Sequence, residues 1–281
     1  MRRLSIVAIA AISTVAFTQI ASAADLPVKA PVYKAPVAVA PSWTGWYIGL
    51  NAGAGWSRSD VSNTFSDASY PGSPYGGNAS AGSSGDITDT AFTGGIQAGY
   101  NWQTGAMVFG LETDFNYLGI KASRSVRAPY GGGIIQGVDV NDEVKADYLG
   151  TLRGRLGYAS GNFLLYATGG LAYTTVKHSH DFSEYGYGSQ THCFAANFCD
   201  LGGSSESKFK LGWTLGGGVE WAFDRNWSLK AEYLYADFGD VSSTTNYYLA
   251  GPPPVLIGNA VVNHSADLTV QVARVGINYR F

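Results

Sequence analysis

The chain carries little charge for its length. Charged residues make up 14% of its 281 residues, against a usual ~25%, and the formal net charge is −3. No basic patch is present, so nothing in the composition supports nucleic-acid binding. After the N-terminal segment, no apolar run reaches the ~20 residues that a transmembrane helix needs. We therefore expect no transmembrane helix after the N-terminal segment, and the composition favours neither a helical bundle nor a disordered chain.

Cysteine is also scarce, with only Cys193 and Cys199 in a polar stretch. Their spacing is not Cys-x-x-Cys, which disfavours a metal or redox pair. In an exported protein, two such cysteines favour a disulfide across a small loop.

Sequence motifs of catalysis are missing as well. The chain has no Gly-x-Ser-x-Gly element, and its glycine clusters lack the strand-to-helix context of a phosphate-binding loop. His178, His180 and His192 lie around one polar stretch, where a His-x-His pair offers one candidate metal site. Solvated loop histidines are the more common alternative. We therefore predict no enzyme activity, no cofactor and no metal.

The N-terminus has the parts of a secretory signal peptide. Two arginines follow Met1, residues 4–17 form an apolar run, and Ala21 and Ala23 form a small-x-small cleavage site. A membrane-anchor helix is the alternative, but the run is short for a membrane span. We predict cleavage after Ala23. The Pro- and Ala-rich residues 24–42 then form an extended periplasmic linker, for which peptidoglycan is a candidate partner.

Glycine and aromatic residues are abundant, with 37 glycines and 14% Phe, Trp and Tyr, a mix that is typical of β-proteins. The chain ends on a segment whose apolar and polar residues alternate at period two, as in a strand. The same alternation recurs and predicts eight strands, at residues 45–56, 92–103, 106–118, 145–159, 163–175, 209–223, 227–235 and 268–281.

The connections between these strands alternate in length. Tight turns are predicted at 104–105, 160–162 and 224–226, and long polar connections at 57–90, 119–144, 176–208 and 236–267. All long connections then lie at one end of the sheet. Short periplasmic turns, long external loops and an even strand number are typical of outer-membrane barrels. The predicted fold is all-β: an eight-stranded antiparallel transmembrane β-barrel over residues 43–281, with four long extracellular loops.

The apolar faces of the strands decide between a membrane barrel and a soluble one. A soluble carrier would have an apolar interior and charged outer faces. Here the apolar faces carry no charge in any predicted strand, and aromatic residues gather near their ends. This arrangement fits lipid between two aromatic belts. The predicted periplasmic belt comprises Trp46, Trp102, Tyr158, Trp221, Trp227 and Tyr279, and the outer belt Trp56, Phe92, Tyr117, Tyr148, Tyr173 and Tyr235.

Charges of opposite sign lie on the inward faces of neighbouring strands. Glu112 and Asp114 face Arg153 and Arg155, Glu220 faces Lys230, and Glu232 faces Arg274; Asp147, Lys210 and Arg280 lie on the same faces. Eight strands leave an interior just wide enough for side chains. We therefore predict a paired charge network that plugs the barrel. A narrow gated pore whose ion pairs exchange is the alternative.

Several segments carry a resemblance to a known family. They include ADLP at 24–27, WTGWYIGLNAGAGW at 43–56, GLETDF at 110–115, LRGRLGY at 152–158 and VGINYRF at 275–281. With these residues the chain resembles the outer-membrane immunogenic, porin-like barrels of alphaproteobacteria, related to opacity-type and OmpA-type barrels. The resemblance implies location in the outer membrane, contact with lipid and lipopolysaccharide, and an assembly signal read by the barrel-assembly machinery at Val275, Ile277, Tyr279 and Phe281.

The resemblance is specific for the barrel and weak for activity. A structural role in envelope integrity, with surface loops for recognition, is the function we expect. Two alternatives remain open: a narrow gated pore for small solutes, and a receptor or adhesin whose loops bind ligands or host surface molecules.

Overall fold

The structure of the protein is a computed structural model that describes residues 41–67, 84–129, 135–186, 201–248 and 259–281. None of the described residues belongs to a helix long and apolar enough to cross a membrane. The predicted signal peptide with Ala21 and Ala23, nearly all of the predicted linker, and the pair Cys193 and Cys199 lie outside the described residues.

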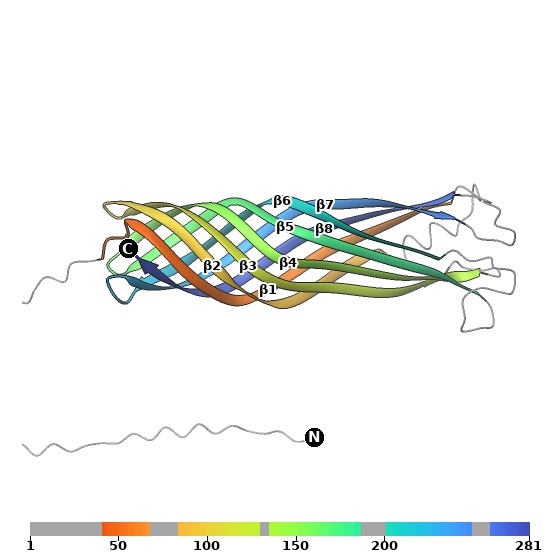
Figure 1. The fold of residues 1–281 in the computed structure, drawn as a ribbon, viewed down its shortest axis with the longest axis horizontal. Coiled ribbons are helices and arrows are strands. Elements are labelled where there is room, and N and C mark those ends of the chain that lie inside the picture. Colours follow the sequence, from red (N-terminus) through yellow and green to blue (C-terminus); the bar gives the residue numbers. More distant parts are fainter. Residues whose placement is uncertain (1–40, 68–83, 130–134, 187–200, 249–258) are drawn as a thin grey trace, which may run out of the picture. The chain divides into compact units, whose positions relative to one another are not determined.

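The described strands follow one another in the sheet in chain order and close into a barrel (Figure 1). Each strand is antiparallel to its neighbours, and β1 completes the barrel by pairing with β8. The predicted eight-stranded antiparallel barrel is confirmed. The strands are β1 Gly45–Asp67, β2 Gly85–Thr104, β3 Met107–Pro129, β4 Ile135–Ser160, β5 Phe163–Gly186, β6 Leu201–Ala222, β7 Trp227–Tyr248 and β8 Asn259–Arg280.

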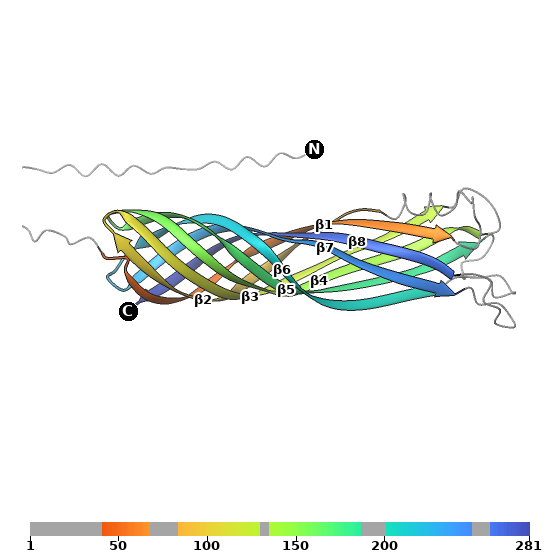
Figure 2. The same cartoon turned by 90° about the horizontal axis from the view of Figure 1, so that it is seen from above.

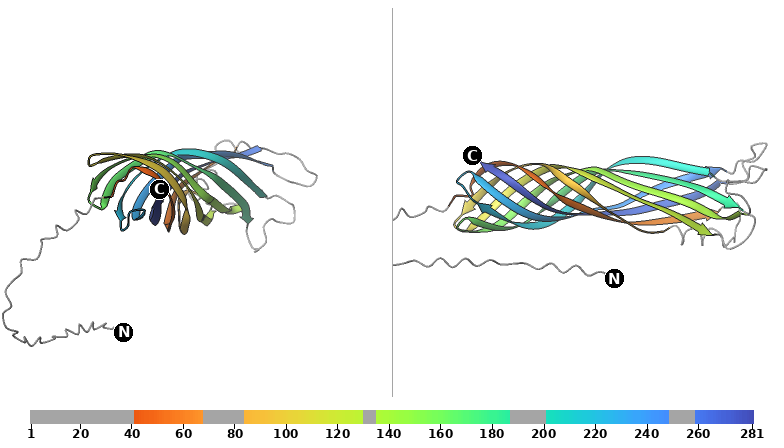
Figure 3. Two further views of the ribbon diagram at one scale, coloured as in Figure 1. Left: turned by 60° about the vertical axis from the view of Figure 1, so that its left-hand side comes forward. Right: turned by 90° about the horizontal axis from the view of Figure 1, so that it is seen from below.

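Three short connections gather with the C-terminus at one end of the barrel, which we call the turn end (Figure 3). Gly105 and Gly161 lie in two of these turns with φ angles of 61° and 58°. This left-handed region is open to glycine without steric cost. The predicted tight turns are therefore confirmed. We call the opposite end of the barrel the far end.

The strands continue well past their predicted limits toward the far end (Figure 2). The alternation predicts that β1 stops at Trp56, but the strand continues to Asp67. It also predicts that β4 starts near Lys145, but the strand starts at Ile135. Large parts of the four predicted long loops are therefore strand, and the predicted strand limits at the far end are wrong.

The reason is an inversion of the apolar face along most of the strands, which β3 illustrates. Nearer the turn end, Phe115 points outward and is 50% exposed, whereas Glu112 points inward and is 2% exposed. Further along, Ile120 points inward and is 2% exposed, and the outward Lys121 side chain is 61% exposed. The apolar residues of the strand therefore point outward nearer the turn end, as in a membrane barrel, and inward further along, as in a soluble barrel. A prediction that follows one apolar face ends where the two patterns meet.

The far half of the barrel also differs in pairing. The β2–β3 ladder ends at the pair Thr93 and Leu118, and the β6–β7 ladder ends at Trp213 and Asp237. The β1–β8 ladder, in contrast, continues to Asp67. Beyond these two points the barrel wall consists of two four-stranded sheets, β7-β8-β1-β2 and β3-β4-β5-β6.

Side chains bridge the two seams where the ladders stop. At the β6–β7 seam, the Nζ atoms of Lys208 and Lys210 donate to the backbone carbonyls of Ser242 and Asp240 at 2.8 and 2.6 Å. At the β2–β3 seam, the backbone N–H of Lys121 on β3 donates to the carboxylate of Asp89 on β2 at 2.7 Å. Lys210 thus lies at a seam and not in the interior charge network.

One predicted inward charge lies outside because of an irregularity in β4. The β4–β5 register shifts between Ala146 and Gly150, which changes the face on which the following residues lie. Asp147 consequently points outward, with its side chain 59% exposed and 3.0 Å from Lys177 Nζ. The prediction that Asp147 lies in the interior is wrong.

Candidate functional site

The interior near the turn end is closed by Trp43, which is fully buried. Its backbone N–H donates to Gln103 Oε1 at 2.8 Å. The guanidinium carbon of Arg280 lies 4.5 Å from the centre of the Trp43 ring, in the range of a cation–π contact. Arg280, which was predicted to carry an inward charge, therefore packs against the Trp43 ring, and its side chain makes no ion pair among the described residues.

Above Trp43, six buried charges form a closed ring in which cations and carboxylates alternate. Each of the six side chains is at most 2% exposed. Three cations balance three carboxylates, as burial requires. The six are Glu112 and Asp114 on β3, Arg153 on β4, Lys230 and Glu232 on β7, and Arg274 on β8.

Arg153 and Glu232 are the most connected members of this ring, because each contacts all three charges of opposite sign. The Arg153 guanidinium lies 2.5 Å from Glu112 and 2.7 Å from Asp114, both on the neighbouring strand β3. Its Nη1 atom also lies 3.1 Å from Glu232 on β7, which is not a neighbour of β4. This last contact joins two strands that are not adjacent, so charged side chains reach across the lumen at this level.

The other two cations close the ring. Arg274 lies 2.5 Å from Glu232 and 3.0 Å from Asp114. Lys230 Nζ lies 3.0 Å from Glu112 and 3.7 Å from Glu232. Every charge in the ring therefore has at least two partners of opposite sign.

A separate ion pair lies beside the ring. Arg155 binds Glu220, whose other carboxylate oxygen accepts hydrogen bonds from Ser228 at 2.5 Å and Asn278 at 2.9 Å. The Arg155 guanidinium carbon also lies 3.7 Å from the centre of the Tyr166 ring. These contacts balance the two remaining predicted charges.

All eight charges predicted for the interior network are buried there, but the predicted partners are only partly those observed. Glu112 and Asp114 pair with Arg153, and Glu232 pairs with Arg274, as the strand order suggests. Arg155, however, binds Glu220 on β6, and Lys230 reaches Glu112 instead of Glu220. Glu220 and Lys230 do face each other in the β6–β7 register, as predicted, but they do not form the ion pair. The ion-pair partners differ because long side chains cross the narrow lumen rather than staying on adjacent strands.

Two tyrosines complete the network and were not among the predicted site residues. Tyr47 on β1 donates to Glu112 at 2.6 Å, and Tyr166 on β5 donates to Glu232 at 2.9 Å. Their signal in the sequence is an aromatic residue on the polar face of a strand. A phenol there supplies a hydrogen-bond donor to a buried carboxylate.

An apolar layer covers the charge network on its far side. The members are buried side chains from both sheets, and they replace the polar groups of the turn-end half. They are Leu118, Ile120, Val144, Ala146, Leu149, Ala172, Val176, Leu234, Ala236, Phe238, Leu268, Val270 and Val272. Such a layer disfavours water and ions in the lumen.

A small polar cluster lies beyond this layer and joins the two sheets. His180 Nδ1 lies 2.6 Å from Asp142 Oδ1, and Asn63 donates to the same carboxylate at 3.3 Å. Burial alone would raise the pKa of Asp142, but hydrogen bonds with His178 and His180 outweigh burial and hold this pKa below its usual range. The two histidines are therefore buried groups in a strand, not solvated loop residues; His192 lies outside the described residues.

The outer surface of the turn-end half is a band of exposed apolar side chains. Trp46, Leu165 and Leu211 are each more than 60% exposed. Water-exposed apolar patches of this extent are rare in soluble monomers, whereas a membrane barrel covers them with hydrocarbon. The aromatic pairs Trp46–Tyr100 and Trp227–Tyr279 lie toward the turn end of the band, in edge-to-face contact with ring centres 5.1 Å apart.

The predicted assembly signal forms the last part of this surface. Val275 and Phe281 are 59% and 71% exposed, and Ile277 is 38% exposed. Tyr279 packs against Trp227, and the Phe281 N–H donates to the Trp46 carbonyl at 3.1 Å, which fixes the chain end on β1.

Comparison with known proteins agrees with this geometry. The family described as the outer membrane protein beta-barrel domain matches residues 28–281. The 31 kDa outer-membrane immunogenic protein of Brucella melitensis biotype 1 is 36% identical over 274 residues, covering 94% of this chain and 95% of that protein. The 22 kDa outer membrane protein of Rhizobium leguminosarum bv. viciae is 33% identical and covers 73% of this chain and 69% of its own length.

Among solved structures, the outer membrane protein OprG from Pseudomonas aeruginosa matches with a TM-score of 0.42 at 14% identity, over 86% of this chain and 98% of that chain. The family match spans the whole described barrel, and the relatives named above are outer-membrane proteins of alphaproteobacteria. The chain therefore belongs to the outer membrane β-barrel family, and within it to the small eight-stranded barrels that include the outer-membrane immunogenic proteins.

Proposed function

We propose that the protein is a structural component of the outer membrane, and that its barrel spans the membrane without conducting solutes. The contact between Arg153 and Glu232, 3.1 Å apart across the lumen, is the observation that carries this proposal. Solutes would have to pass both the charge ring and the apolar layer above it. The layer supports the proposal independently, because exchange of ion pairs alone would not hydrate it.

A gated pore is the second candidate, since buried ion pairs in a ring have alternative partners of similar distance. Arg153, for example, contacts three carboxylates at once. Conduction would require the ring to open and the apolar side chains between the two sheets to separate together. That coupled cost favours the structural role.

Outer-membrane lipid and lipopolysaccharide are the partners that the exposed apolar band supports. The outward positions of Val275, Ile277 and Phe281 support recognition of the last strand by the barrel-assembly machinery. Binding of peptidoglycan by the linker, and of host surface molecules by the loops, concerns segments outside the described residues and stays a prediction.

A deletion strain tests the structural role. Loss of the protein should increase sensitivity to detergent and chelator, and expression of the wild-type chain should restore resistance. Expression of a chain with shortened loops but an intact barrel should restore it equally. A deletion strain with normal envelope resistance but reduced uptake of small solutes would favour the pore instead.

A further inference from the structure

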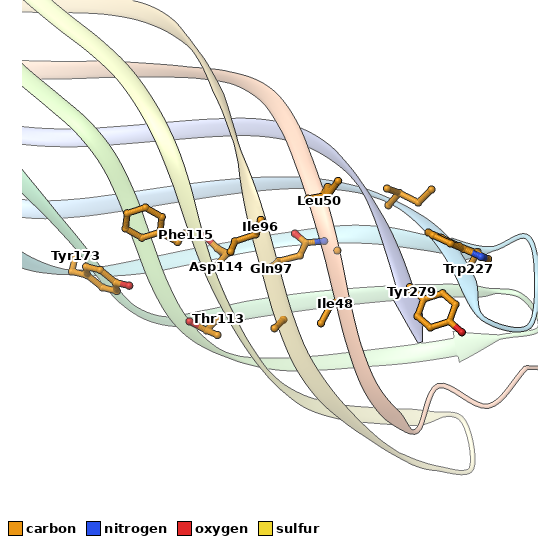
Figure 4. Close-up of a pocket in the computed structure, with 13 residues that line it drawn as sticks. Ile48, Leu50, Ile96, Gln97, Thr113, Asp114, Phe115, Tyr173, Trp227 and Tyr279 are labelled. Carbon is orange, nitrogen blue, oxygen red and sulfur yellow. The ribbon is translucent and has the colours of Figure 1, made fainter. Parts of the chain in front are cut away.

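The lipid-facing band is not uniformly convex. A hollow with a volume of about 510 Å³ lies on its outer surface over β8, β1, β2 and β3, and Tyr173 of β5 and Trp227 of β7 also line it (Figure 4). A second hollow of about 360 Å³ adjoins it, and the two share Ala98 and Thr113. Such volumes are within the usual range for small-molecule sites. We call the two hollows together the groove.

The floor of the groove is low because its residues are small. Ala98 on β2 lies between Ile48 on β1 and Thr113 on β3 in one cross-strand row. The Thr113 hydroxyl donates to the Thr151 carbonyl at 2.9 Å, so its one donor hydrogen is used within the wall. The floor therefore offers an apolar surface flanked by the larger side chains Ile96 and Leu111, which are 61% and 55% exposed.

The two ends of the groove differ chemically. At one end the Tyr173 ring lies over Gly150, where an added Cβ would come within 2.1 Å of the ring. At the other end lie Trp227 and Tyr279, close to the turn end of the barrel (Figure 4). Short turns of outer-membrane barrels face the periplasm, so Trp227 and Tyr279 lie at the periplasmic interface. There an indole N–H and a phenol O–H are suited to polar lipid groups.

We propose that the groove is a binding site for one glycerophospholipid of the periplasmic leaflet. An acyl chain lies along Ala98 and Thr113, and the head-group and ester oxygens accept hydrogen bonds from Trp227 and Tyr279. The groove is continuous with the lipid interface, so hydrocarbon is what covers it. Within hydrocarbon the hydrophobic effect is absent, and retention depends on van der Waals fit, which a concave apolar surface provides better than a convex one.

A second copy of the chain fits the groove less well. Copies related by a two-fold axis meet through the same patch on both, so hollow would face hollow at the centre of the contact. An acyl chain is thin and flexible and fills such a space without requiring a complementary protrusion.

Native mass spectrometry of the full mature protein, extracted from outer membranes in mild detergent, tests the proposal. The wild-type barrel should retain one phospholipid. Ala98→Leu fills the floor and should reduce retention several-fold. Ala167→Leu is the matched control, since Ala167 on β5 also faces outward but lies away from the groove. Palmitoyl-oleoyl phosphatidylethanolamine, added back after delipidation, should rebind to wild type and Ala167→Leu but not to Ala98→Leu.

Heat-modifiable migration in gels verifies that each variant is folded, and Thr113→Leu replaces Ala98→Leu should the latter fail to fold. Equal retention in wild type and the floor variant would overturn the proposal. So would retention of lipopolysaccharide in place of phospholipid, or a lipid-free dimer that the floor variant converts to monomer.

Discussion

Arg153 on β4 and Glu232 on β7 meet across the lumen, with Nη1 and Oε1 3.1 Å apart, although their strands are not adjacent. The contact is part of a ring in which every charge has at least two partners. Buried ion pairs contribute little net stability, but removal of one partner leaves an uncompensated charge. The ring therefore specifies one arrangement of the interior.

Loss of Arg153 should be costly. Arg153→Met keeps most of the side-chain volume but leaves three carboxylates without this partner, and we expect a loss of ~3–5 kcal/mol in the free energy of unfolding. Urea unfolding in micelles, followed by heat-modifiable migration, measures it. The control is Arg58→Met, because Arg58 is 59% exposed in its pair with Asp86 and should cost at most ~1 kcal/mol. Equal losses in the two variants would contradict a specific role for the ring.

A glycine beside the ring should not tolerate a side chain. A Cβ at Gly53 would lie 2.1 Å from the Ala273 carbonyl oxygen and 2.6 Å from Arg274 Cα, both backbone atoms of β8. Gly53→Ala should therefore lower stability by ~1–3 kcal/mol, as overpacking does. At Gly154 the nearest atom lies 3.8 Å away, so Gly154→Ala should be neutral or slightly stabilising. The same urea measurement compares them, and a neutral Gly53→Ala would show that β1 and β8 separate easily.

The two seams should exchange backbone hydrogens faster than the rest of the far half. On the far side of the pair Trp213 and Asp237, the described residues of β6 and β7 form no ladder hydrogen bonds with each other. Lys208 and Lys210 bridge the two strands there instead. Hydrogen exchange measured by mass spectrometry should show low protection there and high protection in β4 and β8. Lys208→Ala with Lys210→Ala should lower protection further at this seam only. Uniform protection of all far-half strands would contradict the two-sheet arrangement.

A row of carboxylates on the outer surface of the barrel should make the stability of the folded barrel depend on pH. Asp240, Asp267 and Asp60 are paired in register on β7, β8 and β1, beyond the apolar band. A hydrogen bond shared with Asp240, together with nearby carboxylates, raises the pKa of Asp267 to about 6.

A raised carboxyl pKa means that ionisation disfavours the folded state. The favourable contribution of neutral Asp267 is complete below its ordinary pKa of 3.8 and is lost as the pH rises through about 6. Asp267→Asn should therefore raise the melting temperature at pH 8 and have no effect below pH ~4. Melting of both proteins across this pH range measures the difference. A stabilisation that is independent of pH would contradict repulsion as the cause.

The sequence predicts the turn-end half of the barrel well. Alternation with apolar residues on one face, as from Val275 to Phe281, identifies the strands, and turn glycines such as Gly105 identify the hairpins. Where Ile120 and Lys121 reverse the chemistry of the two faces, the same criterion fails although the strand continues. To recognise the far half from the sequence, the polarity of the inward and outward faces of each strand must be assessed separately for each part of the strand.

The interior site was predictable in composition but not in connectivity. The period-two alternation places Glu112 and Arg153 on the inward faces of their strands without a structure. The pairing of Lys230 with Glu112 depends on side chains crossing the lumen, which strand order does not encode. The prediction for Asp147 was wrong because a register shift in β4 changes which residues point inward, and such shifts leave no clear signal in the sequence.

A planar-bilayer recording with the purified mature protein tests the central claim most directly, namely that the charge ring and the apolar layer together close the lumen. We predict no discrete current from the wild-type barrel. We also predict none from Arg153→Met, because the apolar layer above the ring remains. Discrete unitary currents in the wild type, changed in size by Arg153→Met, would contradict the closed lumen and favour the gated pore.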